Sequence, residues 1–248
     1  MTDLQAKIEI EQLGTLRFYL NQNFDAALAD LKGEGGSIIT VEELVYAQMQ
    51  REPYHVLSRR DIFVQEGCLF GPGEKQIYLL RNPLVLRHPA EASKRNKTSL
   101  RYVLGQSFNV QEYLEQLHKD AYFVLDDLDP IPTKNFSKDQ RTLWLFGKQA
   151  DDYGRKLNGM GIEKFTFKLH PSQQSSPRPY LYQLVLSQLT GSLIETSTEN
   201  YPYVYVLGVF KTKQQAKQKD TQNKVIIRRP IGINPNLLRL MSIEKKLD

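Results

Sequence analysis

Apolar residues recur at helical spacing in several parts of the chain. In the segment FDAALADLK, the side chains of Phe24, Ala27, Leu28 and Leu31 fall on one helical face, and glycines follow directly. Two further segments, VEELVYAQMQ and VQEYLEQLHK, have the same period. The pattern therefore predicts three short helices, over residues 24–32, Val41–Gln50 and Val110–Lys119.

The start of the second predicted helix carries a specific signal. Thr40 precedes it and Glu43 stands three residues later, which is the arrangement of a capping box. In a capping box each of the two side chains accepts a hydrogen bond from the other residue's backbone N–H group. We expect the helix to begin at Val41 and to end before Pro53.

The other apolar runs are short, rich in β-branched and aromatic residues, and bounded by glycine, proline or polar residues, as is typical of strands. Because they do not alternate regularly with helices, the sequence favours an α+β fold with a mainly antiparallel sheet and a few short helices. The predicted strands are Asp61–Gln65, Cys68–Phe70, Gln76–Arg81, Tyr122–Leu125, Thr142–Phe146, Lys164–Leu169, Tyr180–Leu189 and Tyr203–Phe210.

The stretch CLFGPGEKQIYLLR, residues 68–81, raises the question of a ligand-binding loop. Glycine and lysine occur together in it, but strand-like runs flank the turn on both sides and no helix follows to face a phosphate. Proline between two glycines suits a tight reversal. We therefore predict a hairpin around Gly71-Pro72-Gly73. The polar segments Arg87–Lys97 and 170–179 are predicted to be surface loops.

The length of 248 residues suffices for one large domain or two small ones. We predict a single α+β domain over residues 1–248, with the interval 126–138 as the candidate boundary if the chain is divided. The single cysteine excludes an internal disulfide and suits a reducing compartment. The N-terminus lacks a secretory signal and no apolar run is long enough for a membrane span, so a cytoplasmic location is expected.

Positive charge is concentrated in residues 209–248, the basic C-terminal region. It carries +7, whereas the rest of the chain carries −2 and the whole +5. Mobile cations beside aromatic strands are typical of nucleic-acid backbone contacts, although lysine runs are also common on solvated surfaces. A second basic stretch follows Pro83. The candidate nucleic-acid-binding residues are Arg87, Lys94, Arg95, Lys97, Arg101, Lys211, Lys213, Lys217, Lys219, Lys224, Arg228 and Arg229.

Catalytic motifs are sparse. The four histidines are widely spaced and no zinc-type or nucleotide-binding spacing occurs, so we predict no catalytic residue, metal or cofactor. One alternative stays open: Asp126, Asp127 and Asp129 follow a predicted strand, and carboxylates there can bind Mg²⁺ in a nuclease. Asp151-Asp152 is a weaker candidate of the same kind. For the acids at 126–129, the competing interpretation is turn formation before Pro130.

The pattern Leu69-Phe70-Gly71, followed by Glu74 and by Leu79-Leu80-Arg81, resembles a strand–turn–strand signature of the small accessory subunit of type III-D CRISPR effector complexes. That family's signature ends in Leu-Trp-Arg, where this chain has Leu-Leu-Arg. A second segment, RTLWLFGKQADDY at 141–153, is similar to the same signature and repeats the Leu-Phe-Gly triplet.

The resemblance implies a non-catalytic structural and RNA-contacting subunit of a guide-RNA ribonucleoprotein, whose partners are guide RNA and larger protein subunits rather than a membrane. Two alternatives remain: the metal-dependent nuclease described above, and a stand-alone protein-interaction module of a phage or mobile element.

Overall fold

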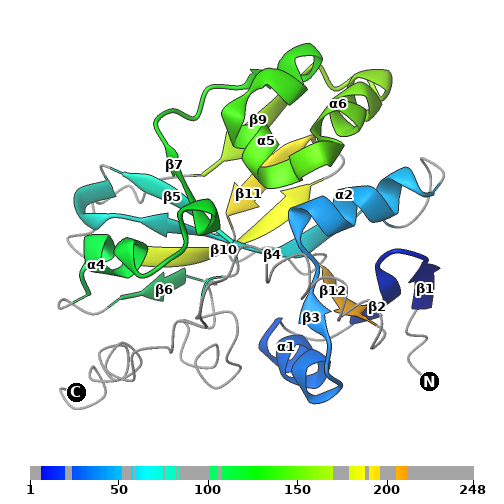
Figure 1. The fold of residues 1–248 in the computed structure, drawn as a ribbon, viewed down its shortest axis with the longest axis horizontal. Helices are drawn as coiled ribbons and strands as arrows, with labels where there is room; N and C mark the ends of the chain where they lie inside the picture. Colours follow the sequence, from blue (N-terminus) through cyan, green and yellow to red (C-terminus); the bar gives the residue numbers. More distant parts are fainter. Residues whose placement is uncertain are drawn as a thin grey trace.

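The fold is seen in a computed structural model that describes residues 7–19, 24–51, 57, 60–74, 76–81, 83, 101–104, 108–169, 179–187, 190–195 and 205–211. These residues form one twelve-stranded sheet with helices on both faces (Figure 1). The strands are β1 (Lys7–Ile10), β2 (Gly14–Tyr19), β3 (Ser37–Ile38), β4 (Asp61–Phe70), β5 (Ile77–Leu80), β6 (Arg101–Val103), β7 (Tyr122–Leu125), β8 (Ile131–Pro132), β9 (Lys164–Lys168), β10 (Tyr180–Ser187), β11 (Ser192–Glu195) and β12 (Tyr205–Phe210).

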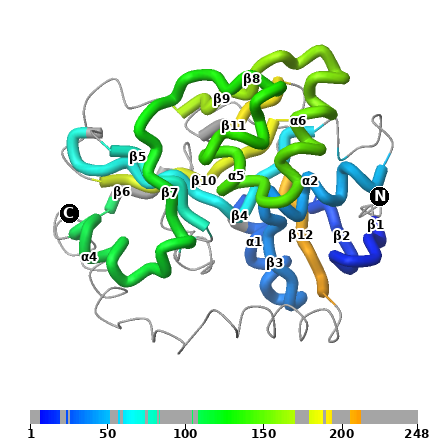
Figure 2. The backbone as a smooth tube through the Cα atoms, turned by 45° about the horizontal axis from the view of Figure 1, so that its top comes forward, coloured from blue at the N-terminus to red at the C-terminus, as the bar shows by residue number. Residues whose placement is uncertain are grey.

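The sheet is mixed rather than mainly antiparallel. Its main path runs β1-β2-β12-β4-β10-β11-β9-β8, and β3, β5, β6 and β7 branch from it. The pairs β12–β4 and β11–β9 are parallel, and the other pairings of the described strands are antiparallel. The predicted α+β class is thus confirmed. The prediction missed the parallel pairs because β12 returns from the far end of the chain to lie beside β4 (Figure 2).

The helices are divided between the two faces of the sheet (Figure 1). On one face α2 (Val41–Met49), α5 (Gln140–Phe146) and α6 (Ala150–Gly159) pack into the largest apolar core. On the other face, α1 (Phe24–Gly33) and α4 (Val110–Glu115) each cover a smaller core. Strand β10 contributes to all three cores and is buried along its whole length, so it forms the centre of the molecule.

The capping box at the start of α2 is confirmed. The Thr40 hydroxyl accepts a hydrogen bond from the Glu43 N–H at 3.1 Å, and the Glu43 carboxylate accepts one from the Thr40 N–H at 3.2 Å. Helices α1 and α4 also lie where the apolar period predicts them. However, α4 ends at Glu115, and a short 3-10 turn, η4 (Lys119–Ala121), follows instead of a continued helix.

The predicted strand Thr142–Phe146 is wrong, because these residues lie in helix α5. The Asp139 side chain accepts a hydrogen bond from the Arg141 N–H at 2.8 Å and caps the helix start. Thr142, Leu145 and Phe146 are buried together, which is an i, i+3, i+4 pattern and not a strand alternation. Tertiary packing on this helical face overrides the strand propensity of the segment.

The hairpin around Gly71 is confirmed. Strands β4 and β5 pair antiparallel from Phe70↔Ile77 to Gly67↔Leu80, and the turn η2 (Pro72–Glu74) joins them. Gly73 has φ +67°, which favours glycine. The two predicted runs before the turn form one continuous strand, β4. Of the later predicted strands, β7, β9, β10 and β12 lie where expected, whereas the predicted loops 87–97 and 170–178 lie outside the described residues.

The interval 126–138, the candidate domain boundary, contains β8 and the 3-10 helix η5 (Thr133–Lys138). Phe136 from this interval is 1% exposed and belongs to the same core as residues on both sides of it in the chain. The domain division itself stays a prediction. No helix in the described ranges is long and apolar enough to span a membrane.

Candidate functional site

The residues of the Leu-Phe-Gly hairpin are used mainly in packing. Leu69 and Phe70 are 1% and 0% exposed, and they point to opposite faces of the sheet because neighbouring strand residues alternate. Phe70 stacks on Tyr180 with ring centroids 4.8 Å apart in the largest core, and Leu69 packs in the core under α4. The first half of the signature therefore joins the cores on the two sides of the sheet.

Arg81, at the end of the signature, joins the hairpin to the second Leu-Phe-Gly segment. Its backbone N–H donates to the Ala121 carbonyl at 2.8 Å, and its guanidinium donates to the Trp144 carbonyl. The same guanidinium lies 4.5 Å from the centre of the Trp144 ring, a cation–π contact. The Trp144 indole N–H donates in turn to the Asp120 carbonyl at 3.2 Å. The two segments that resemble the same signature are thus in direct contact.

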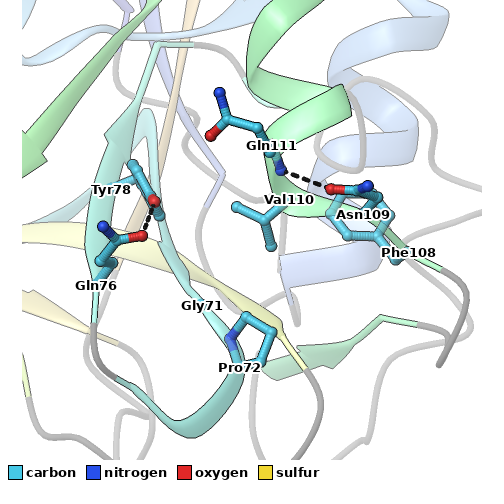
Figure 3. A pocket seen from close by; sticks show the side chains of 8 residues that line it. All are labelled: Gly71, Pro72, Gln76, Tyr78, Phe108, Asn109, Val110 and Gln111. Atoms are coloured by element: carbon cyan, nitrogen blue, oxygen red, sulfur yellow. Dashed lines mark hydrogen bonds between the residues drawn. The ribbon is translucent and has the colours of Figure 1, made fainter.

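A pocket of about 400 Å³ opens between the hairpin turn and the start of α4. Figure 3 shows Gln76 and Tyr78 on one side, residues 108–111 on the other, and Pro72 at the turn. The Tyr78 hydroxyl donates to the Gln76 carboxamide. The pocket is lined by Gly71, Pro72, Gln76, Tyr78, Phe108, Asn109, Val110 and Gln111.

The polar groups of this pocket are uncharged amides and one phenol. The Asn109 side chain caps α4 by accepting from the Gln111 and Glu112 N–H groups at 3.0 and 3.3 Å. Burial raises the pKa of Tyr78, and the neighbouring Tyr122 raises it further, so the phenol is neutral at neutral pH. The lining suits an uncharged ligand held by contact and hydrogen bonds.

The predicted nucleic-acid-binding residues fall mostly outside the described residues. Lys211 is described, and its ammonium lies 2.6 Å from the Glu43 carboxylate, with the two side chains 22% and 11% exposed. This cation is therefore paired at the first turn of α2. Arg101 lies in β6, the strand next to β10. Outside the described residues lie Arg87, Lys94, Arg95, Lys97, Lys213, Lys217, Lys219, Lys224, Arg228 and Arg229.

Of the three aspartates that follow β7, Asp127 is engaged in a turn and an ion pair, and Asp126 and Asp129 are exposed. The Asp127 carboxylate accepts the Asp129 N–H at 3.0 Å and also binds the Arg141 guanidinium. Arg141 binds Asp139 at 2.7 Å as well, and this arginine holds the pKa of Asp139 below its usual range. In the described ranges, no three potential metal ligands lie close enough together to hold an ion.

The weaker acidic pair, Asp151 and Asp152, lies in the first turn of α6. Both carboxylates bind Arg155 on the same helix, and that of Asp151 lies 2.6 Å from the guanidinium. Cys68 is buried, as its strand position predicts. Of the histidines, His118 caps the turn η4 through its ring, whereas His55, His88 and His170 lie outside the described residues.

Sequence reasoning missed one buried carboxyl group. Glu66, in the middle of β4, is 1% exposed and accepts the Val41 N–H at 3.0 Å, at the start of α2. Burial raises its pKa to about 7, against the opposing effect of that hydrogen bond. The detectable signal was a single charged residue within the strand run IFVQEGCLF.

No family model matches this chain, and no curated protein matches it. One solved structure does: a protein described by the phrase "Accommodation of massive sequence variation in Nanoarchaeota by the C-type lectin fold". The match has a TM-score of 0.59 and 14% sequence identity, and it covers 85% of this chain and 100% of the other. At this identity the likeness shows the fold alone.

Proposed function

We propose that this protein is a non-catalytic structural subunit of a CRISPR-type, type III-D-like guide-RNA ribonucleoprotein, and that it contacts the RNA. The observation that carries the proposal is how the signature residues are used. Leu69 and Phe70 fill two cores, and Arg81 holds the second Leu-Phe-Gly segment through Trp144. A scaffold subunit requires its signature residues for packing, whereas the signature residues of an enzyme would direct reactive groups into a cleft.

The RNA contact in this proposal rests on the basic C-terminal region. Because Lys211 is paired with Glu43, the contact is assigned to the cations that follow it, from Lys213 onward. Backbone phosphates attract such cations, and counterion release makes the binding steeply dependent on salt. The assembly is proposed to act in the cytoplasm.

The C-type lectin likeness supports a binding protein in a more general way. The matched nanoarchaeal protein is described as accommodating massive sequence variation on that fold. We propose that in this chain, too, the sheet and its cores form a constant framework, while binding depends on the surface segments. This part of the proposal is an analogy between folds.

The test is to isolate the tagged full-length protein from its native cells at low and at high salt. We expect larger proteins and RNA of guide length to co-purify, with the RNA retained at low salt. A variant with Lys213, Lys217, Lys219 and Lys224 changed to Glu should lose RNA at least tenfold.

A matched control changes the exposed lysines Lys134, Lys138, Lys148 and Lys164 to Glu, which alters the net charge equally but in another segment of the sequence. Equal RNA loss in both variants would mean that only net charge matters and would refute the assigned contact. Recovery of the wild-type protein alone, without RNA or larger proteins, would refute the function itself.

The pocket beside the hairpin favours a second candidate, a stand-alone protein-interaction module of a phage or mobile element. Its uncharged lining suits a peptide better than a phosphate backbone. This candidate predicts that protein partners co-purify without RNA and that partner binding changes little with salt.

A further inference from the structure

Strand β7 is an edge of the sheet. It pairs with β5 on one side, from Ile77↔Leu125 to Leu80↔Tyr122, and no described strand pairs with its other side. Its four residues present an edge about 13 Å long. An unpaired edge of this kind is a template for an added strand.

The hydrogen-bond pattern shows which backbone groups face outward. The Arg81 N–H donates to the Ala121 carbonyl, so positions 81 and 121 form a hydrogen-bonded pair. In an antiparallel ladder hydrogen-bonded and non-hydrogen-bonded pairs alternate. The pairs 80↔122 and 78↔124 are therefore non-hydrogen-bonded, and the N–H and C=O groups of Tyr122 and Val124 point away from β5.

Apolar side chains flank this edge on both faces of the sheet. Val124, 37% exposed, lies on the same face as Tyr78 and Tyr122, whose rings are 6.4 Å apart. On the opposite face the centroid of the Phe123 ring lies 6.1 Å from that of the partly buried Trp144. An added strand with alternating side chains would find apolar contacts on at least one face.

Exposed acidic side chains follow β7 at its C-terminal end, where they are Asp126, Asp127 and Asp129. At the other end Asp120 is the neighbour of Lys119 in the chain, and Arg81 bonds the backbone of Ala121, so that end carries no excess of negative charge. Arg141 binds both Asp127 and Asp139, so it offsets only one of these two charges. The C-terminal end of the edge thus favours a segment with a positive flank.

One register between two copies of this chain is unfavourable. Antiparallel pairing of two β7 strands with Tyr122 of each copy opposite Val124 of the other brings Asp120 of each copy opposite Asp126 of the other. Like charges directly opposite one another destabilise a strand pair. In this register the charge pattern therefore favours a different chain.

We propose that β7 binds an extended, basic segment of a protein partner, which adds a strand to the sheet beside Tyr122 and Val124. The inference rests on the proposed function, in that the partner is another protein subunit of the same assembly.

The decisive variant is Val124→Pro. Proline removes the Val124 N–H, which makes no bond to β5, so the fold is kept while the added strand loses a donor. Val124→Thr is the matched control, because it keeps the N–H. The probe is a labelled ten-residue peptide that alternates valine with lysine, and a peptide that alternates valine with glutamate is the second control.

We expect the lysine peptide to bind the wild type and Val124→Thr alike, and Val124→Pro about tenfold more weakly. The glutamate peptide should bind at least about tenfold more weakly than the lysine peptide to the wild type. Should Val124→Pro fail to fold, the double variant Asp126→Asn with Asp129→Asn supplies an independent test: it should weaken lysine-peptide binding and reduce the dependence of that binding on salt. Any one of four results would overturn the inference. The wild type does not bind the lysine peptide, the two peptides bind equally, Val124→Pro binds as tightly as the wild type, or the protein self-associates through this edge.

Isolation from native cells separates this inference from the proposed function. If the wild type and Val124→Thr bring down protein partners and Val124→Pro loses one of them, the inference stands. If Val124→Pro retains every partner, the inference fails and the function survives. If the wild type brings down none, the function fails.

Discussion

The same three residues, Leu-Phe-Gly, occur twice in this protein and adopt different structures. At 69–71 they end strand β4, and Leu69 and Phe70 point to opposite faces of the sheet. At 145–147 they end helix α5, and Leu145 and Phe146 both enter the same core. The difference teaches that the flanking residues and the available core, rather than the triplet, decide between strand and helix.

The strongest test of this comparison is to truncate the phenylalanine of each triplet. Phe70 and Phe146 are both fully buried, and each stacks on a tyrosine, at 4.8 and 4.9 Å respectively. Phe70→Ala and Phe146→Ala should each lower the free energy of unfolding by about 3–5 kcal/mol. Chemical denaturation measures the loss, and Leu143→Ala, at an exposed position of α5, should cost less than about 1 kcal/mol. A small loss for either phenylalanine would contradict its role in the core.

The second test concerns the carboxyl group upstream of each triplet. The pKa of Glu66 is raised to about 7 from an ordinary value of 4.5, so its neutral form favours the fold. This contribution is complete below pH 4.5 and is lost as the pH rises through about 7, a change of about 3 kcal/mol. In Glu66→Gln this loss should be absent.

The measurement for Glu66 is the free energy of unfolding of wild type and Glu66→Gln between pH 4.5 and pH 8. Asp139, upstream of the second triplet, behaves in the opposite sense: its pKa is lowered, so its contribution is present above its unfolded pKa and lost as the pH falls. A difference between wild type and Glu66→Gln that stays constant over this pH range would contradict the assignment for Glu66.

The third test compares the two glycines. Gly147 has φ +53°, and a methyl group there would lie 2.6 Å from the Glu42 carboxylate. The nearest neighbour of a methyl group at Gly71 is the Gln76 carbonyl, at 3.4 Å. Gly147→Ala should therefore lower the free energy of unfolding by about 2 kcal/mol, and Gly71→Ala by less than about 1 kcal/mol. Thermal unfolding of both variants checks this, and equal losses would refute the distinction.

The smallest expected effect is at the helix cap. Asp139→Ala removes the cap of α5 and one partner of Arg141, and it should cost about 1 kcal/mol. Denaturant unfolding at pH 7 measures this cost, with Asp129→Ala as the control, since that side chain is exposed. If both variants lose the same free energy of unfolding, the cap does not explain why the second triplet lies at the end of a helix.

Local signals made part of the fold predictable. The Thr40–Glu43 capping box and the Gly71–Gly73 turn depend on neighbouring residues only, and both are confirmed. Helix α5 was missed because TLWLF has strand-forming residues, and only the core contributed by other elements selects the helix. The parallel pairing of β12 with β4 joins residues 205–206 to 62–63, a separation that no local pattern encodes.

The candidate site was less predictable than the fold. The hairpin that borders the pocket was expected. Residues 108–111 form the other side of the pocket only because α4 packs there. The Arg81–Trp144 contact and the edge of β7 that no described strand pairs with also depend on the pairing of distant segments. Charge alone suggested that Lys211 contacts RNA, and the nearby Glu43 carboxylate changes that expectation.

The position of β12 has a consequence for synthesis of the chain. This strand lies between β2 and β4, so in the described residues it alone joins the β1–β2 hairpin to the rest of the sheet. Until residues 205–210 leave the ribosome, β2 and one side of the first residues of β4 lack their neighbour. At about 5–20 residues per second, roughly ten seconds or more of translation pass before the sheet can close. The β1–β2 hairpin can therefore fold onto the sheet only after β12 has been synthesised.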